Sequence, residues 1–242
     1  MRIPTISNDE LMQQHLQALY HHDETLRLTA INDWRGGVAP RFFLGRTDRG
    51  NLWRFRNDLS GEICDALDTL CRVEPAATSE QPAQAAAFHR ILLAQAHTAQ
   101  IWRGPAYWFP YEAAPIGTPV GAPAGQVGPI DEQQAYLLKG GLSDWIPDIP
   151  YQQPFVAVIV AGQAVSVCSS VRITANAHEA GVETLATHRR RGYAVAAVST
   201  WAHLVQQQGA LALYSTSFDN VGSQSVAARL GLSRYGVDFH IT

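Results

Sequence analysis

The feature that most constrains the fold of this chain is a loop at residues 188–194, which joins a strand-like run to a helix-like run. The loop reads His-Arg-Arg-Arg-Gly-Tyr-Ala and follows the extended run 178–187. A helix N-terminus carries unpaired N–H donors and a partial positive charge. Glycine and three arginines at this point therefore predict a phosphate-binding loop. The helix after the loop is indicated by one apolar stripe, formed by Val195, Val198, Ala202 and Val205.

The order of elements around this loop predicts a mixed α/β sheet, of the α+β kind. The apolar, β-branched runs 155–161 and 164–173 are joined by Gly162-Gln163 and lead into 178–187, which predicts an antiparallel meander. Parallel strands joined through a helix have a right-handed crossover, so we expect the loop at the carboxyl edge of the sheet, where such sheets bind ligands. The whole order is β-β-β-α-β-α-β, completed by a strand at 211–215, a helix at 221–230 and a strand at 235–241.

The first half of the chain predicts a separate set of elements and a domain boundary. Residues 113–129 hold glycine or proline too often to sustain a helix or a sheet interior. We therefore expect residues 1–128 to form an N-terminal α/β region of unknown role that ends in this Gly/Pro-rich loop, and residues 129–242 to form a second domain. The remaining expected elements are helices at 8–20, 60–73 and 82–101, strands at 41–45, 52–56 and 106–109, and one or two short helices within 131–149, broken at Gly140-Gly141 and Pro147.

Composition excludes several classes of protein. The chain is 46% hydrophobic and 16% charged, which permits a sizeable core, and its net charge of −3 argues against a general nucleic-acid binder. The longest apolar stretch, 155–168, is shorter than the roughly 20 residues that span a bilayer. No signal peptide is evident. We therefore expect a cytoplasmic protein that binds neither nucleic acid nor membrane.

Cysteine and histidine usage predicts no metal site. Cys64, Cys71 and Cys168 form no C-x-x-C pair, which favours buried, reduced thiols. The pair His21-His22 lies next to Asp23, but no further ligands are spaced to complete a coordination shell.

Two motifs resemble those of a known family, the GCN5-related N-acetyltransferases (GNATs). The R-x-x-G-x-A spacing of Arg189, Gly192 and Ala194 resembles the family's acyl-CoA pyrophosphate loop. The run 220–232 is similar to its N-x-x-S-x-x-V-A-x-K/R-L-G-F signature. One helix and one strand separate the motifs, as in the family, and the resemblance covers about 130–242. It implies a GNAT-like acyl-CoA N-acyltransferase fold, with acetyl-CoA or coenzyme A as the cosubstrate.

The resemblance also implies roles for individual residues. Backbone N–H groups of 191–194 would hold the pyrophosphate, and the strand that ends near Leu185 would pair with the pantetheine amides. A backbone N–H near Leu185 would polarise the acyl carbonyl. Asn220 would contact the pantetheine arm, and Ser223 would lie near the thiol end or the phosphates. The implied cofactor-binding residues are Leu185, Ala186, Thr187, Arg189, Arg190, Arg191, Gly192, Tyr193, Ala194, Asn220 and Ser223.

Acyl transfer to an amine needs a proton acceptor, because a free alkylamine with a pKa near 10.4 is mostly protonated at pH 7. Glu183 is the first candidate for this general base, since it lies on the strand that enters the loop. Glu179, four residues earlier, is the second, and His178 is the third. Many family members carry a tyrosine acid where this chain has Ala227, so Tyr214 or Tyr235 is expected to protonate the leaving thiolate instead.

Several interpretations stay open from the sequence alone. The reaction is expected to be direct attack of an amine, because Cys168 has no evident activating base. The alternatives are a CoA-binding regulatory or structural module without turnover and another nucleotide-binding α/β protein. The arginines could also be a solvated turn, Glu183 could pair with Arg172, and Trp145 could be core or line an acceptor pocket. The acceptor, a small-molecule or peptide amine, is unspecified, and a homodimer is allowed.

Overall fold

The computed structural model describes residues 6–94, 96, 99–110 and 125–242. It divides into two compact units that interleave along the chain. The first unit combines the residues up to Tyr107 with Ser215–Val221 and Arg234–Thr242, and the second combines Trp108–Tyr214 with Gly222–Ser233. The single boundary expected between residues 128 and 129 does not coincide with this division.

The first unit is built on four neighbouring strands. In order across the sheet these are β4 (Asn51–Phe55), β3 (Phe42–Arg46), β11 (Ser233–Ile241) and β5 (Ile101–Trp108). β3 pairs antiparallel with both β4 and β11. Beside them lies a two-stranded sheet of β1 (Tyr20–His22) and β2 (Leu28–Ile31).

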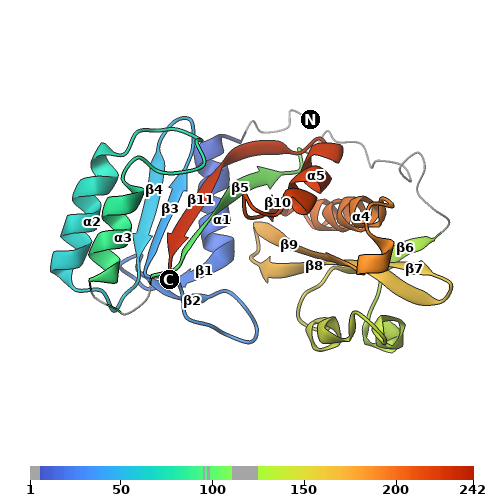
Figure 1. The fold of residues 1–242 in the computed structure, drawn as a ribbon. Helices are drawn as coiled ribbons and strands as arrows, with labels where there is room; N and C mark the ends of the chain where they lie inside the picture. The colour runs from blue at the N-terminus through green and yellow to red at the C-terminus, as the bar shows by residue number, and fades with distance from the viewer. Residues whose placement is uncertain (1–5, 95, 97–98, 111–124) are drawn as a thin grey trace. The chain divides into compact units, whose positions relative to one another are not determined.

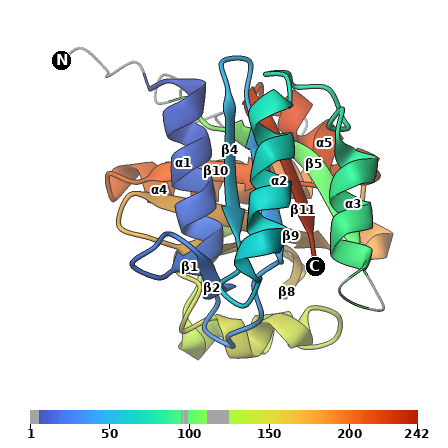
Figure 2. The ribbon, with the colours of Figure 1, turned by 90° about the vertical axis from the view of Figure 1, so that its left-hand side faces the viewer.

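Helices cover both faces of this sheet, because β3 buries side chains on each side. Helix α1 (Asn8–Leu19) lies on the face of Phe43, whose ring contacts His15. Helices α2 (Gly61–Val73) and α3 (Ala85–Leu93) lie on the opposite face (Figure 2). There Phe42 and Leu44 join a core cluster with residues of both helices, such as Leu67 and Phe88.

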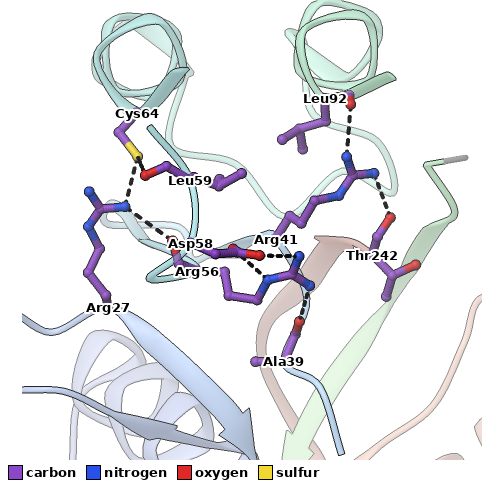
Figure 3. A network of polar contacts seen from close by, with 9 residues as sticks. All are labelled: Arg27, Ala39, Arg41, Arg56, Asp58, Leu59, Cys64, Leu92 and Thr242. Atoms are coloured by element: carbon purple, nitrogen blue, oxygen red, sulfur yellow. Dashed lines mark hydrogen bonds and ion pairs between the residues drawn. The ribbon is translucent and has the colours of Figure 1, made fainter. Parts of the chain in front are cut away.

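Arginines fasten the ends of these elements to one another (Figure 3). The guanidinium of Arg41 is buried and donates to the carbonyl oxygens of Leu92 and Thr242, both at 2.8 Å. The Arg56 guanidinium donates hydrogen bonds to the Asp58 carboxylate and to the carbonyl oxygen of Ala39. Because each guanidinium has five donors in a rigid fork, one side chain can satisfy several backbone groups at once.

A buried ion pair joins β3 to the end of α2. The Arg46 guanidinium lies 3.3 Å from a carboxylate oxygen of Glu74, and the two side chains are 1% and 0% exposed. Glu74 also accepts the backbone N–H groups of Ala83 and Gln84, at 2.8 and 2.9 Å. The carboxylate therefore neutralises Arg46 and also anchors the segment that leads into α3.

Replacing Glu74 by glutamine is expected to lower the free energy of unfolding by about 3 kcal/mol, because Arg46 would stay charged and buried without a counter-charge. Arg72→Gln is the matched control. It removes a surface ion pair in which the Arg72 side chain is 70% exposed and the Asp68 side chain 30%. We therefore expect the free energy of unfolding to fall by less than about 1 kcal/mol. Urea unfolding of both variants measures the difference, and equal losses of free energy would contradict it.

The second unit carries the predicted meander and the loop after it. Its strands run in the order β10 (Leu211–Ser215), β9 (Ala177–Thr184), β8 (Gln163–Ile173), β7 (Phe155–Val160) and β6 (Gln126–Pro129). The pairs β6–β7, β7–β8 and β8–β9 are antiparallel, and β9–β10 is parallel. The expected mixed α/β sheet, an antiparallel meander followed by β-α-β-α-β, is therefore confirmed.

Different elements cover the two faces of this sheet (Figure 1). Helix α4 (Tyr193–Gln207) packs on one face, and Trp201 buries its indole there. The 3-10 helices η1 (Glu132–Leu138) and η2 (Ser143–Asp148) cover the other face. There Leu137, Leu142 and Ile149 form a core cluster with strand residues such as Phe155 and Val167. The last helix of the unit is α5 (Val221–Arg229).

Three expected elements differ from the structure. The helix expected at 82–101 is α3, which ends at Leu93, and β5 begins at Ile101 rather than 106. The expected break at 113–129 contains β6, because an edge strand tolerates glycine and proline. Residues 113–124 of that break lie outside the described residues. The strand expected to reach 187 ends at Thr184 and passes into a 3-10 turn, η3 (Ala186–His188). Within the described ranges, no helix has the length and apolar character to cross a membrane.

Candidate functional site

The arginine loop lies where the sequence predicted it, between β9 and α4. Two of its residues have left-handed backbone conformations, Arg190 with φ +60° and Gly192 with φ +87°. Gly192 is the N-cap of α4, and having no side chain, it cannot cap the helix. The first N–H groups of α4, including those of Tyr193 and Ala194, therefore have no acceptor within the helix. This leaves donors and a partial positive charge at the end of the loop.

Four arginines belong to this helix end, three from the loop itself and one from α5. Arg189, Arg190 and Arg191 are exposed, and Arg189 Nε donates to the carbonyl oxygen of Thr184 at 3.2 Å. Arg229, from the last turn of α5, places a guanidinium nitrogen 3.7 Å from where a Cβ on Gly192 would lie. Arg229 is not among the site residues expected from the sequence, although it occupies the K/R position of the downstream signature.

Beside the loop, β9 has an edge that β10 does not cover. The last pair between these two strands is Glu179 with Leu213, and β9 runs on to Thr184. The N–H of Leu185 donates to Val165 on the β8 side, at 3.0 Å. Because backbone groups alternate in direction along a strand, Val182 and Thr184 direct theirs toward the opposite edge. In the described structure that edge has no further strand partner, and it leads directly into the arginine loop.

Glu183 has a defined side-chain partner. It is exposed near the end of β9, and Trp145 of η2 donates its indole N–H to a carboxylate oxygen of Glu183 at 2.5 Å. The indole is itself held by an edge contact with the Phe155 ring, with centroids 6.0 Å apart. Gly181 lies between Glu179 and Glu183 on the same face of β9, since side chains alternate along a strand. The glutamate is therefore paired with Trp145, not with Arg172.

The absence of a side chain at Gly181 allows this arrangement. A Cβ there would lie 2.2 Å from Val171 Cγ1 and 3.3 Å from Trp145 Cη2. We expect Gly181→Ala to lower the free energy of unfolding by about 1–3 kcal/mol, because the half-buried Val171 side chain must shift to admit the new methyl group. Gly128→Ala on β6 is the control, since a Cβ there meets nothing within 4 Å. Thermal unfolding compares them, and equal melting temperatures would refute the expectation.

The other candidate bases lie deeper. Glu179 is buried, opposite Arg172 in the β8–β9 register. His178 is buried under α4, where Trp201 Nε1 donates to Ser170 Oγ at 3.0 Å and Ser170 Oγ lies 2.9 Å from His178 Nδ1. If the serine hydroxyl donates onward, His178 Nδ1 is an acceptor and the ring is neutral. Burial lowers the pKa of His178, which agrees with a neutral ring inside the core.

The remaining predicted residues divide between the units. In the second unit, Tyr214 on β10 is buried and its hydroxyl donates to the carbonyl oxygen of Ser223 at 3.4 Å. Asn220 and Tyr235 belong to the first unit. Tyr235 is buried there, with its ring edge-on to His15. Ala227 is buried on α5 and offers no hydroxyl.

The cysteines are free and buried in the described structure. Burial raises the pKa of the Cys168 thiol well above its usual value, so at neutral pH Cys168 is a protonated thiol and a weak nucleophile. Among the described residues, no group of three or more His, Cys, Asp or Glu side chains could hold a metal ion.

Comparisons with known proteins agree with this geometry. The sequence model of the GNAT acetyltransferase family matches residues 155–236. This region spans β7 to the start of β11 and includes both motifs. The resemblance read from the sequence is thus confirmed over residues 155–236. A search of curated proteins found no match.

Solved structures show the same fold across nearly the whole chain. A GCN5-related N-acetyltransferase-like protein from Streptococcus suis is 13% identical, with a TM-score of 0.53, covering 98% of this chain and 100% of its own. A GCN5-related N-acetyltransferase from Kribbella flavida is 17% identical (TM-score 0.53; 99% and 96% covered). Another from Sphaerobacter thermophilus is 14% identical (TM-score 0.52; 100% and 87% covered). At these identities the likeness is one of fold.

Proposed function

We propose that the protein transfers an acetyl group from acetyl-CoA to an amine, by direct attack of the amine with general-base assistance. The observation that carries the proposal is the continuity of two features within the second unit. The uncovered edge of β9 leads into the arginine loop, and the loop opens onto the unpaired N–H groups of α4. A carrier with amides at one end and a pyrophosphate at the other matches this sequence of donors.

The residues present fit the diphosphate of coenzyme A. Gly192 keeps the helix end open, and the loop arginines together with Arg229 supply the counter-charge. Along the strand edge, Val182 offers its backbone groups to the amide-bearing arm. Thr184 offers its N–H, since its carbonyl oxygen already accepts Arg189 Nε. The N–H of Leu185 is engaged with Val165, so a donor to the acyl carbonyl would come from this edge instead.

Acetyl-CoA supplies an acyl group that is already activated as a thioester. The chain's own task is to remove a proton from the attacking amine, and Glu183 is the exposed carboxylate next to the uncovered edge. Tyr214 lies in the same unit as Glu183 and is our first choice to protonate the leaving thiolate. Tyr235 is the second choice. We propose a cytoplasmic enzyme that acts on a small-molecule or peptide amine, with homodimer formation allowed.

One observation favours a second candidate function, a coenzyme A-binding module without turnover. Ala227 stands where many members of the family carry a tyrosine acid, and it is buried and chemically inert. A coenzyme A thiolate, with a pKa near 8.5 by analogy to cysteine, can nevertheless leave with little help. We therefore rank the enzyme first.

Thermal shift with acetyl-CoA, followed by acetyl transfer to a panel of amines, tests the proposal. At 100 times its dissociation constant, acetyl-CoA should stabilise the protein by about 2.7 kcal/mol, and ATP and NAD should not. Transfer to at least one amine, with free coenzyme A released, supports the enzyme. Binding without transfer to any amine supports the second candidate. No stabilisation by acetyl-CoA would contradict both.

A further inference from the structure

The Trp145–Glu183 hydrogen bond joins two elements that the family signature does not connect. Glu183 lies on β9, inside the matched region, and Trp145 lies on η2, before residue 155 where that region begins. Figure 1 shows η2 on the face of the sheet opposite α4. The bond therefore brings a residue from outside the signature to the carboxylate beside the uncovered strand edge.

The surroundings of Glu183 fix its backbone but leave its side chain exposed. The backbone pairs with Val167 on β8, and its carbonyl oxygen accepts the Ser166 hydroxyl at 3.0 Å. The side chain itself is exposed, so without a partner it would sample several rotamers. The indole N–H, at 2.5 Å from one carboxylate oxygen, selects one of them and leaves the other oxygen for a second partner.

Trp145 is well placed to impose this orientation because its own ring is held. It packs against the core cluster under η1 and η2, with the Phe155 ring edge-on to it. On β9, the bare Cα of Gly181 lets the ring lie close to the strand. The indole is therefore a fixed donor, and the glutamate is the group that it orients.

We propose that Trp145 is a positioning residue, whose indole N–H holds the Glu183 carboxylate in the orientation from which it accepts the proton of the attacking amine. This inference rests on the proposed function. Trp145 touches neither reacting atom, and it acts only through Glu183. A residue that acts through another loses its effect when the other is removed, which a double-mutant cycle detects.

The first test is kinetic. Trp145→Phe keeps an aromatic ring but removes the N–H, and we expect kcat to fall about 10-fold while KM for acetyl-CoA is unchanged. In the Glu183→Gln background the same change should cause no further loss. Trp53→Phe is the control, because Trp53 also donates its indole N–H to a carboxylate, Asp68, at 3.1 Å in the first unit. That control should keep full activity.

The second test needs no turnover. Among the indole N–H signals of the six tryptophans in a ¹⁵N–¹H spectrum, the Trp145 signal is the one lost in Trp145→Phe. Glu183→Gln should shift that signal more than any other. If the wild type is active, either of two results overturns the positioning role alone. One is a Trp145 signal that Glu183→Gln does not shift, and the other is an equal loss of kcat in both backgrounds. If the wild type transfers acetyl to no amine, the proposed function and the positioning role fall together.

Discussion

Gly192→Glu is expected to weaken acetyl-CoA binding at least about 100-fold, a loss of roughly 2.7 kcal/mol. The substitution puts a carboxylate at the N-terminus of α4, where the unpaired N–H groups and the loop arginines would otherwise meet the pyrophosphate. Two effects act together. The new side chain occupies the space through which the pyrophosphate would approach the backbone N–H groups. Its negative charge repels the phosphates and pairs with the arginines in their place. Titration calorimetry with acetyl-CoA measures the loss.

The same helix offers a matched control at its other end. Gly209 follows the C-terminus of α4 with φ +81°, and a Cβ there would meet nothing within 4 Å. Gly209→Glu therefore adds the same charge at a similar left-handed backbone, with the same cost in strain. We expect this variant to bind acetyl-CoA like the wild type. If the two variants bind equally well, the arginine loop is not the phosphate site.

Glu183→Gln is expected to lower kcat for acetyl transfer by roughly 10²–10⁴-fold, the range that general-base assistance contributes. Glutamine keeps the size of the side chain and can still accept the Trp145 N–H, but it cannot take the proton of the amine. Because the residue is exposed, the fold and acetyl-CoA affinity should stay as in the wild type. Steady-state kinetics on the best amine of the panel measure the effect.

Glu179 and Tyr214 provide the comparison for that result. Glu179→Gln tests the second candidate base, and Tyr214→Phe tests the hydroxyl that donates to Ser223. A large loss of kcat in Glu179→Gln, with none in Glu183→Gln, would assign the general base to Glu179, four residues earlier on β9. Buried positions such as these need a check of the melting temperature, since each change alters the core.

The elements around the loop could be predicted because their signals are local. The apolar, β-branched runs, the turn at Gly162-Gln163 and the apolar stripe of α4 each lie within a few residues, and all appear in the structure. The same holds for Gly192, since a loop between strand and helix favours a residue that tolerates positive φ. The uncovered strand edge was expected only through the family resemblance, because it depends on the register of β9 with β10.

What the sequence did not reveal depends on contacts between distant segments. Gly104 looks like a strand breaker, yet β5 needs it, because a Cβ there would lie 1.8 Å from the carbonyl oxygen of Thr216. Arg229 approaches Gly192 only in the folded chain. The partner of Glu183 is Trp145, and nothing in their spacing of 38 residues predicts the bond.

The place of β11 in the first unit has a consequence for biosynthesis. This strand lies between β3 and β5, yet it is translated after every other element of the fold. A nascent chain paused before residue 233 would expose the β3 edge that β11 later covers, and an open strand edge invites pairing with other chains. The sheet of the first unit can therefore be completed only after residues 233–241 have been synthesised.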